Sequence, residues 1–168
     1  VDATGTTCIG QGWGGIGVGG SDHVIGGDMP EEGNQICGYD HWGISVSGTG
    51  NLVGHNAVYG SGEDGILVTG SDNLLAHNEI HENADDGVEV RGETALHNTC
   101  TENSIHDNGG PGIILVEGGN TELPAPVVLT YDVGAGTATG TACALCTVEV
   151  FSDEDDEGRW YEGTVEAD

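Results

Sequence analysis

The sequence predicts an all-β chain that coils on itself, because two short patterns recur with one spacing. The first is a strand-like phrase with aliphatic residues at alternate positions between glycines, as in Gly65-Ile66-Leu67-Val68-Thr69-Gly70, which is typical of short β-strands. It begins, in steps of 22, 22 and 25 residues, at Gly43, Gly65, Gly87 and Gly112. The second is an asparagine followed two residues later by Ile or Val, at Asn34, Asn56, Asn78 and Asn103. Two patterns with a common period indicate a repeated structural unit.

Each repeat is interpreted as one turn of a coil. A strand this short cannot bury its apolar face alone, so successive repeats must stack. Stacking at about 4.8 Å, the strand spacing of a sheet, aligns two aliphatic columns inside the coil: Ile44, Ile66 and Val88, and Val46, Val68 and Val90. The asparagines then lie at corners, where they bond backbone groups of the next turn and tolerate left-handed conformations. We therefore expect a right-handed parallel β-helix with about 22 residues per rung, its hand set by strand twist and crossover preference.

These phrases, together with Glu32-Gly33-Asn34-Gln35-Ile36, resemble the repeats of right-handed parallel β-helices in secreted and surface proteins of bacteria and archaea, within the pectate-lyase-like superfamily. The resemblance covers about residues 8–120. It implies the fold but leaves the function open, because this fold carries lyases, hydrolases, adhesins, metal-associated proteins and inert spacers.

The repeating part of the chain has recognisable limits. Gly15-Ile16-Gly17-Val18-Gly19 is an earlier copy of the strand phrase, and its 28-residue distance from Gly43 fits a loop at 28–33. The three extra residues of the last step fall within 93–97 and predict another loop. We therefore assign residues 1–122 to the β-helix.

The character of the sequence changes at two prolines. Pro124 and Pro126 cannot take part in ladder pairing, so residues 123–126 are expected to form a linker. Residues 127–168 predict four antiparallel strands joined by turns. This small module resembles the start of a β-sandwich and is too short for a comfortable core of its own. It must dock on the coil, pair with another chain, or be truncated.

The composition excludes some functions and favours others. There are 29 acidic residues, two arginines and no lysine, giving a formal charge of −27. This charge excludes nucleic-acid binding through phosphate neutralisation, and an anionic membrane would repel the chain. It fits a solvated acidic exterior or the binding of divalent cations. Five cysteines predict an oxidising, extracellular or cell-surface location, and no apolar run is long enough for membrane insertion.

Paired aspartates are the first candidate for chemistry. Asp64 and Asp86 precede the strand glycines of successive turns, and Asp85 lies alongside. Two carboxylates about one strand spacing apart can catalyse glycoside hydrolysis or hold calcium, but we favour exposed turn aspartates. β-Helical polygalacturonases are similar in clustering aspartates on a strand face, yet their His-Gly and Arg-x-Lys partners have no counterpart here. Arg91 is the only arginine of the predicted helix, and one arginine cannot hold an acidic polysaccharide.

A second acidic candidate lies near the C-terminus. Asp153, Asp155 and Glu157 alternate before Gly158, so their side chains could turn onto one calcium ion, as in the first half of a calcium loop. The twelfth position is Thr164 rather than the expected acid, for which Glu162 or Glu166 would have to substitute. An acidic hairpin turn is the other interpretation and the one we favour.

Histidines and cysteines recur at related positions. His55 and His77 are one repeat apart, as are His81 and His106, and we expect an exposed stacked ladder with Tyr59 because parallel rings do not converge on a metal. The CxxC pair Cys143 and Cys146 predicts a structural disulfide, and Cys8 and Cys37 fall one rung apart and predict another. Cys100 is then either buried or free for an intermolecular link.

Together these features predict a non-catalytic extracellular structural protein. We expect a rigid acidic rod in a fibre, surface layer or adhesin, which assembles end to end with copies of itself through exposed strand edges or associates with other surface components. Glycans are a further expected class of partner. One alternative is a polysaccharide-active or carbohydrate-binding β-helix of the glycoside-hydrolase type that uses Asp64, Asp85 and Asp86. The other is a calcium-dependent binding module.

Overall fold

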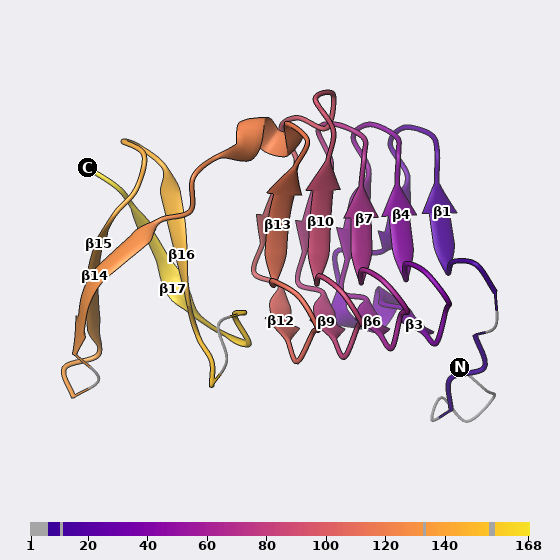
Figure 1. Ribbon diagram of the computed structural model, residues 1–168, viewed down its shortest axis with the longest axis horizontal. Coiled ribbons are helices and arrows are strands. Elements are labelled where there is room, and N and C mark those ends of the chain that lie inside the picture. The colour runs from indigo at the N-terminus through magenta and orange to yellow at the C-terminus, as the bar shows by residue number, and fades with distance from the viewer. Residues whose placement is uncertain (1–6, 11, 133, 155–156) are drawn as a thin grey trace.

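Three parallel sheets run side by side along one axis in the computed structural model, which describes residues 7–10, 12–132, 134–154 and 157–168. Figure 1 shows the strands of the first sheet as a row of arrows from β1 to β13. The first sheet contains β1 (Ile16–Val18), β4 (Ile44–Val46), β7 (Ile66–Val68), β10 (Val88–Arg91) and β13 (Ile113–Val116). The second contains β2 (Val24–Gly26), β5 (Leu52–Gly54), β8 (Leu74–Ala76) and β11 (Thr99–Thr101). The third contains β3 (Gln35–Cys37), β6 (Ala57–Tyr59), β9 (Glu79–His81) and β12 (Ser104–His106). The predicted parallel β-helix is confirmed.

The strand register confirms one rung per repeat. Equivalent residues of the first sheet pair at separations of 28, 22, 22 and 25 residues, in the order Ile16, Ile44, Ile66, Val88 and Ile113. The first long step accommodates a loop with the short 3-10 helix η1 (Pro30–Glu32), and the last accommodates the loop around residues 93–97. Extra residues therefore leave the sheets as loops and do not disturb the stacking.

The interior of the coil consists of the predicted aliphatic columns. Six side chains of the first sheet are fully buried, namely Ile44, Ile66, Val88, Val46, Val68 and Val90. The other sheets add Val53, Leu75, Val58 and Ile80, which are equally buried, and all belong to one hydrophobic cluster. Burial of such a side chain contributes roughly 1.5–3 kcal/mol, and each column repeats that contribution at every rung.

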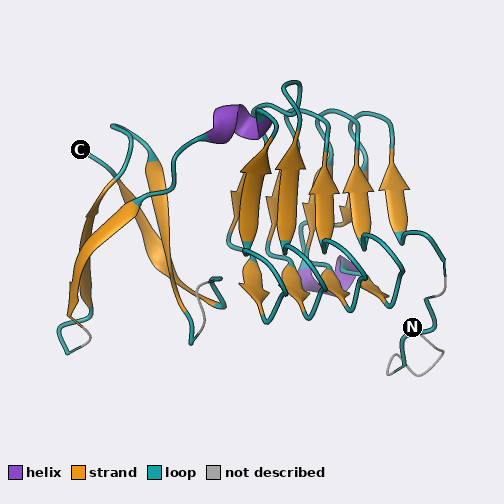
Figure 2. Ribbon diagram, viewed as in Figure 1, coloured by secondary structure: helices purple, strands orange, loops and turns teal. Residues whose placement is uncertain are grey.

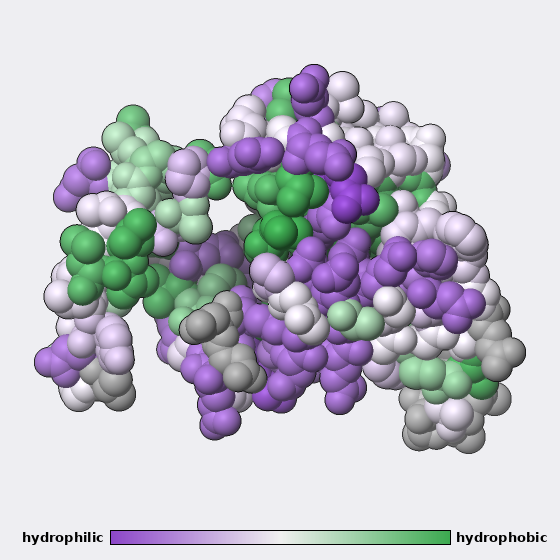
Figure 3. All heavy atoms as spheres, viewed as in Figure 1, coloured by the Kyte–Doolittle hydropathy of each residue, from purple (hydrophilic) through white to green (hydrophobic). Residues whose placement is uncertain are grey.

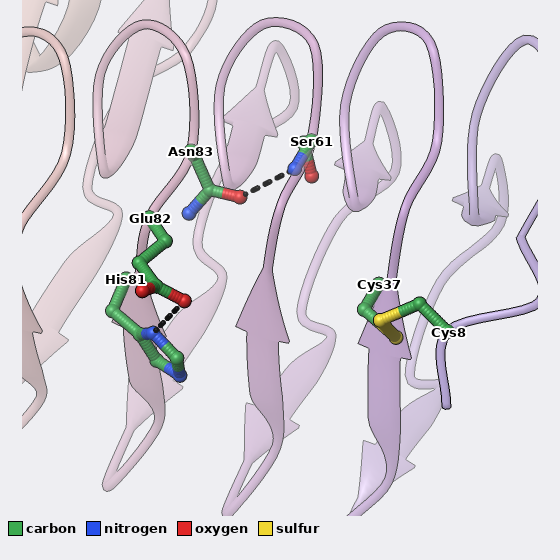
Figure 4. The surroundings of a disulfide bond; sticks show 6 residues. All are labelled: Cys8, Cys37, Ser61, His81, Glu82 and Asn83. Carbon is green, nitrogen blue, oxygen red and sulfur yellow. Dashed lines mark hydrogen bonds and ion pairs between the residues drawn. A yellow bond between two sulfur atoms is a disulfide. The ribbon is translucent and has the colours of Figure 1, made fainter. Parts of the chain in front are cut away.

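Asparagine side chains connect the rungs at the corners. The predicted ladder of Asn34, Asn56, Asn78 and Asn103 is confirmed. Oδ1 of each of the last three accepts from the backbone N–H and the Nδ2 of the preceding asparagine, at 2.9–3.1 Å. Two further ladders were not predicted. One joins Asn51, Asn73, Asn98 and Asn120. The other joins Ser61, Asn83 and Asn108, and its bond from the Ser61 N–H to Asn83 is drawn in Figure 4.

The left-handed conformation at these corners belongs to the residue before the asparagine, not to the asparagine itself as the sequence suggested. His55, His77 and Glu102 have φ of 57°, 56° and 50°, and they precede Asn56, Asn78 and Asn103. This turn aims the next backbone N–H along the axis, toward the Oδ1 of the following rung. The corner geometry and the ladder are therefore one feature.

Four antiparallel strands follow the β-helix, as predicted, but they form two separate hairpins. After the short helix η2 (Gly119–Glu122), β14 (Val127–Asp132) pairs with β15 (Thr137–Thr141), and β16 (Thr147–Ser152) pairs with β17 (Trp160–Glu166). Figure 2 shows both hairpins beyond the last rung. The second hairpin contacts that rung, since the Ile105 N–H donates to the Gly158 carbonyl at 3.1 Å. Docking on the coil, one of the three alternatives for this segment, is thus seen for the β16–β17 hairpin, whereas β14 and β15 are exposed along their whole length.

Both predicted disulfides are present. Cys8–Cys37 fastens the segment before β1 to the end of β3, as Figure 4 shows, and Cys143–Cys146 closes the turn before β16. Cys100 is free and packs against the core, where burial raises the pKa of its thiol to about 12. A thiol held neutral in this way is a poor nucleophile, so the structure favours the buried alternative.

The ladder predicts a position-dependent loss of stability. Asn78→Ala removes four side-chain hydrogen bonds, to Asn56, Val53 and Asn103, and leaves buried partners unpaired. Each unsatisfied buried group costs about 1–3 kcal/mol, so we expect the free energy of unfolding to fall by about 3 kcal/mol or more in urea unfolding. Asn34→Ala is the matched control: this exposed residue loses one side-chain bond, and about 1 kcal/mol is expected. Equal losses would contradict the ladder.

Candidate functional site

Three acidic side chains meet on the outer face of the first sheet. Asp64 and Asp86 precede Gly65 and Gly87 one rung apart, and Glu89 belongs to β10. Because Val88 and Val90 point into the core, the side chain between them points outward. One carboxylate oxygen of each acid lies within 4.8 Å of the others. We call Asp64, Asp86 and Glu89 the acidic cluster.

All three acids of the cluster are buried, with exposed fractions of 6%, 6% and 5%. The expectation of exposed turn aspartates at Asp64 and Asp86 is therefore wrong. The reason is stacking: the next rung passes so close to Asp86 that a side chain on Gly110 would begin 2.2 Å from its Oδ1. Among the described residues, Oδ1 of Asp64 and Oδ1 of Asp86 have no hydrogen-bond partner. Asp85 is exposed and lies outside the cluster.

Burial dominates the electrostatics of the cluster. Burial, together with the negative charges of Glu89 and Asp86, raises the pKa of Asp64 to about 7. It also raises the pKa of Asp86 and of Glu89, while the Arg91 guanidinium opposes both shifts. Arg91 pairs with Glu89 through two contacts, Nε to Oε1 at 2.5 Å and Nη2 to Oε2 at 3.1 Å. Of the three acids, Glu89 is the one whose ionised form is stabilised by direct pairing with an arginine.

This arrangement has two chemical uses. Near neutral pH, a carboxyl with a pKa of about 7 can hold a proton beside Glu89, whose carboxylate pairs with Arg91. Glycoside hydrolysis uses such a pair, one acid as proton donor and the other as nucleophile or base. The unpartnered oxygens of Asp64 and Asp86 are equally the hard ligands that a divalent cation prefers.

Glu89 was missed by the sequence analysis, although a signal existed. The outward position of the strand phrase is Ser45 in β4 and Leu67 in β7, and both align with Glu89 in register. A charged residue at this position departs from the other copies of the phrase. Glu89 follows Asp86 by three residues, after the turn into β10, and its side chain lies on the same outer face as that of Asp86.

The histidines stack as predicted. Ring centroids of Tyr59 and His81 are 4.9 Å apart, those of His81 and His106 are 5.1 Å apart, and those of His55 and His77 are 4.8 Å apart. Figure 4 shows His81 turned toward its neighbour Glu82, 3.4 Å away. The ladder is not fully exposed as expected, because His106, beside the docked hairpin, is buried. Stacked parallel rings do not converge on one point, which agrees with a ladder.

The acidic run near the C-terminus is only partly described. Asp155 lies outside the described residues. Asp153 accepts from the backbone N–H of Glu154 at 2.7 Å and of Gly158 at 3.1 Å, as in a turn. Both oxygens of Glu157 accept bonds from Asn108, so this side chain contacts the β-helix. Calcium binding by this run stays a prediction.

Comparison with known proteins identifies the fold of the central part of the chain. Residues 42–124 match the family described as "Right handed beta helix region". Searches of curated proteins and of solved structures gave no match. Within the described residues, no helix is long and apolar enough to cross a membrane. The matched segment contains β4 to β13, hence most of the ladders and the whole acidic cluster.

The raised pKa of Asp64 predicts a pH dependence of stability. Its pKa is about 7 in the folded chain against an ordinary value of 3.8. Between these values the folded state binds a proton that the unfolded state releases, so the free energy of unfolding falls from about pH 4 to about pH 7. Asp64→Asn keeps a neutral side chain of similar shape and should remove this component in urea unfolding across that range.

The control for this experiment is Asp85→Asn, which changes an exposed neighbour in the same turn. Its stability profile should keep most of the wild-type slope, because the Asp85 charge is the smallest of the causes that raise the pKa of Asp64. Parallel profiles for the wild type and Asp64→Asn would show that the folded chain does not hold this proton.

Proposed function

We propose that this protein, in which residues 42–124 belong to the right-handed β-helix family, is a non-catalytic structural component that acts outside the cell as a rigid acidic rod. The observation that carries the proposal is the set of three side-chain ladders along the coil. Each ladder adds bonds parallel to the axis to those of the three sheets. A bend between rungs would therefore break side-chain bonds as well as sheet pairing.

Location and charge fit this role. Two disulfides support an oxidising, extracytoplasmic setting. The charge of −27 keeps rods apart and soluble at low salt. Such a rod becomes a structural element only if it binds something else, and the simplest partner is another copy.

The first rung offers the means of self-association. Strands β1, β2 and β3 are the terminal strands of the three sheets, and no strand of the described residues pairs with their outer sides. Exposed edges accept strands from other chains. Assembly through such edges must overcome the repulsion of two highly acidic chains.

Self-association is therefore expected to depend on salt. The average mass from light scattering should rise with protein concentration, and more strongly in 1 M sodium chloride, where the screening length is about 3 Å, than in 0.01 M, where it is about 30 Å. A mass that equals one chain at every concentration and salt level would refute the self-associating rod.

A polysaccharide hydrolase is the second candidate, favoured by the proton-holding Asp64 beside the ion-paired Glu89. If the role is structural, the wild-type protein should release no more reducing ends from neutral polysaccharides than the double variant Asp64→Asn/Glu89→Gln releases. Neutral substrates are chosen because the acidic chain repels acidic ones. Release that is lost in the double variant and kept in Asp85→Asn would replace the structural role with hydrolysis.

A further inference from the structure

The two ends of the β-helix differ in whether their edge groups have partners. Along one corner, the His55 N–H donates to the Ala76 carbonyl and the His77 N–H to the Thr101 carbonyl, each one rung further on. The series ends with the Glu102 N–H, which donates to the Glu149 carboxylate of β16 at 3.0 Å. The same carboxylate accepts from the Thr101 hydroxyl. Glu149 thus takes the place of a carbonyl of the next rung.

A second corner shows the same substitution. The backbone N–H of Ser61 donates to Oδ1 of Asn83, and that of Asn83 donates to Oδ1 of Asn108. The Asn108 N–H and Nδ2 then donate to the Glu157 carboxylate at 2.9–3.2 Å. Glu157 accepts the bonds that a further asparagine would accept.

In the third sheet, the hairpin also supplies backbone groups. The Ile105 N–H of β12 donates to the Gly158 carbonyl at 3.1 Å, and the Ser104 hydroxyl donates to the Arg159 carbonyl at 2.7 Å. The β16–β17 hairpin therefore imitates a rung over the second and third sheets. None of the last-rung strands β11, β12 and β13 pairs with a further strand of the described residues, but β11 and β12 make these bonds to the hairpin. Figure 3 shows apolar surface over β13, beside the opening between the β-helix and the hairpins.

At the opposite end the corresponding groups point outward and have no partner among the described residues. Leu52 N–H donates to the His23 carbonyl and Ala57 N–H to the Asn34 carbonyl, toward the first rung. By register, Val24 and Gln35 are the equivalents of Leu52 and Ala57, so their N–H groups point off the end. Oδ1 of Asn34, which begins its ladder, accepts no bond from the described residues. This end presents both donors and acceptors.

The first-rung end is also unlike the rest of the chain in charge and polarity. Residues 7–27 contain one acidic side chain, Asp22, out of 29 in the chain, and the loop that follows adds three exposed acids, Asp28, Glu31 and Glu32. Large apolar side chains lie exposed there or in the loop that follows: Ile9, Trp13, Val24 and Met29, with exposed fractions of 53–69%. An apolar patch is visible near this terminus in Figure 3. Residues 7–27 therefore bring little negative charge to a contact between copies, and their exposed apolar side chains can be buried there.

We propose that this surface binds the same surface of a second copy, so that two β-helices join first rung to first rung and the β16–β17 hairpin covers the second and third sheets at both outer ends. The inference rests on the proposed structural role and specifies its partner. Identical surfaces that carry donors and acceptors can pair about a two-fold axis, and such an interface closes after two chains. The rod then is a pair of fixed length rather than an open fibre.

Sedimentation equilibrium of the whole chain in 1 M sodium chloride tests this pairing. The expected mass is that of two chains with no larger species. Val24→Pro removes the outward N–H at the start of an edge strand, where proline is tolerated, and should weaken association at least tenfold. Val24→Thr keeps the N–H and should retain the pair. Circular dichroism of both variants shows whether the coil is intact.

A second experiment loosens the β16–β17 hairpin from the last rung. Glu149→Ala/Glu157→Ala takes away the carboxylates that hold the hairpin and should produce species larger than two chains, whereas Glu157→Gln keeps an acceptor oxygen and should not. Wild-type species larger than two chains would overturn the closed pair but leave the structural role standing. A wild-type mass of one chain in all conditions would overturn the self-association on which both depend.

Discussion

The structure depends on one requirement: every polar group at a corner of the coil must find its partner in the next rung. A buried N–H or side-chain amide without a partner costs about 1–3 kcal/mol, and a single rung has none to offer. The corners also contain left-handed residues such as His77 and Glu102, each at a cost of roughly 1–2 kcal/mol. The ladder bonds to Asn78 and Asn103 offset these costs only when rungs stack. The stability of the coil therefore depends on the whole stack of rungs and not on any single rung.

The same requirement explains why the ends of the coil are the places where function is expected. Inside the stack, every equivalent group is occupied by its neighbours along the axis. At the last rung, Glu149 and Glu157 reproduce the missing neighbours with carboxylates. At the first rung, the described residues provide no such substitute for the Val24 N–H or for Oδ1 of Asn34. Among the described residues, stacking creates a conflict at the acidic cluster, because it buries acids from adjacent rungs close to one another.

Much of the fold could be predicted because the repeated sequence determines which side chains point inward and how the rungs align. Alternation within Gly65–Gly70 identifies the inward side chains, and the common period of Asn34, Asn56 and Asn78 sets the register. The ladder of Asn51 and Asn73 has the same period and was available in the sequence. The charge at Glu89 was likewise visible as a departure from Ser45 and Leu67.

Other features could not be predicted, because they depend on contacts between rungs or between distant segments. The burial of Asp86 follows from the approach of Gly110 in the next rung, which no spacing reveals. The roles of Glu149 and Glu157 depend on where a non-repeating hairpin docks. The left-handed corner fell on His77 rather than Asn78, because the ladder requires the asparagine itself to face along the axis.

The most direct test of this account is hydrogen exchange of the asparagine side-chain amides, measured by nuclear magnetic resonance. Both Nδ2 hydrogens of Asn56 and Asn78 are engaged in buried bonds, so the account predicts strong protection and cross-peaks between the side chains of successive ladder residues. Exchange at the rate of free amides at Asn56 and Asn78 would contradict the ladder and, with it, the stacking of one rung per repeat.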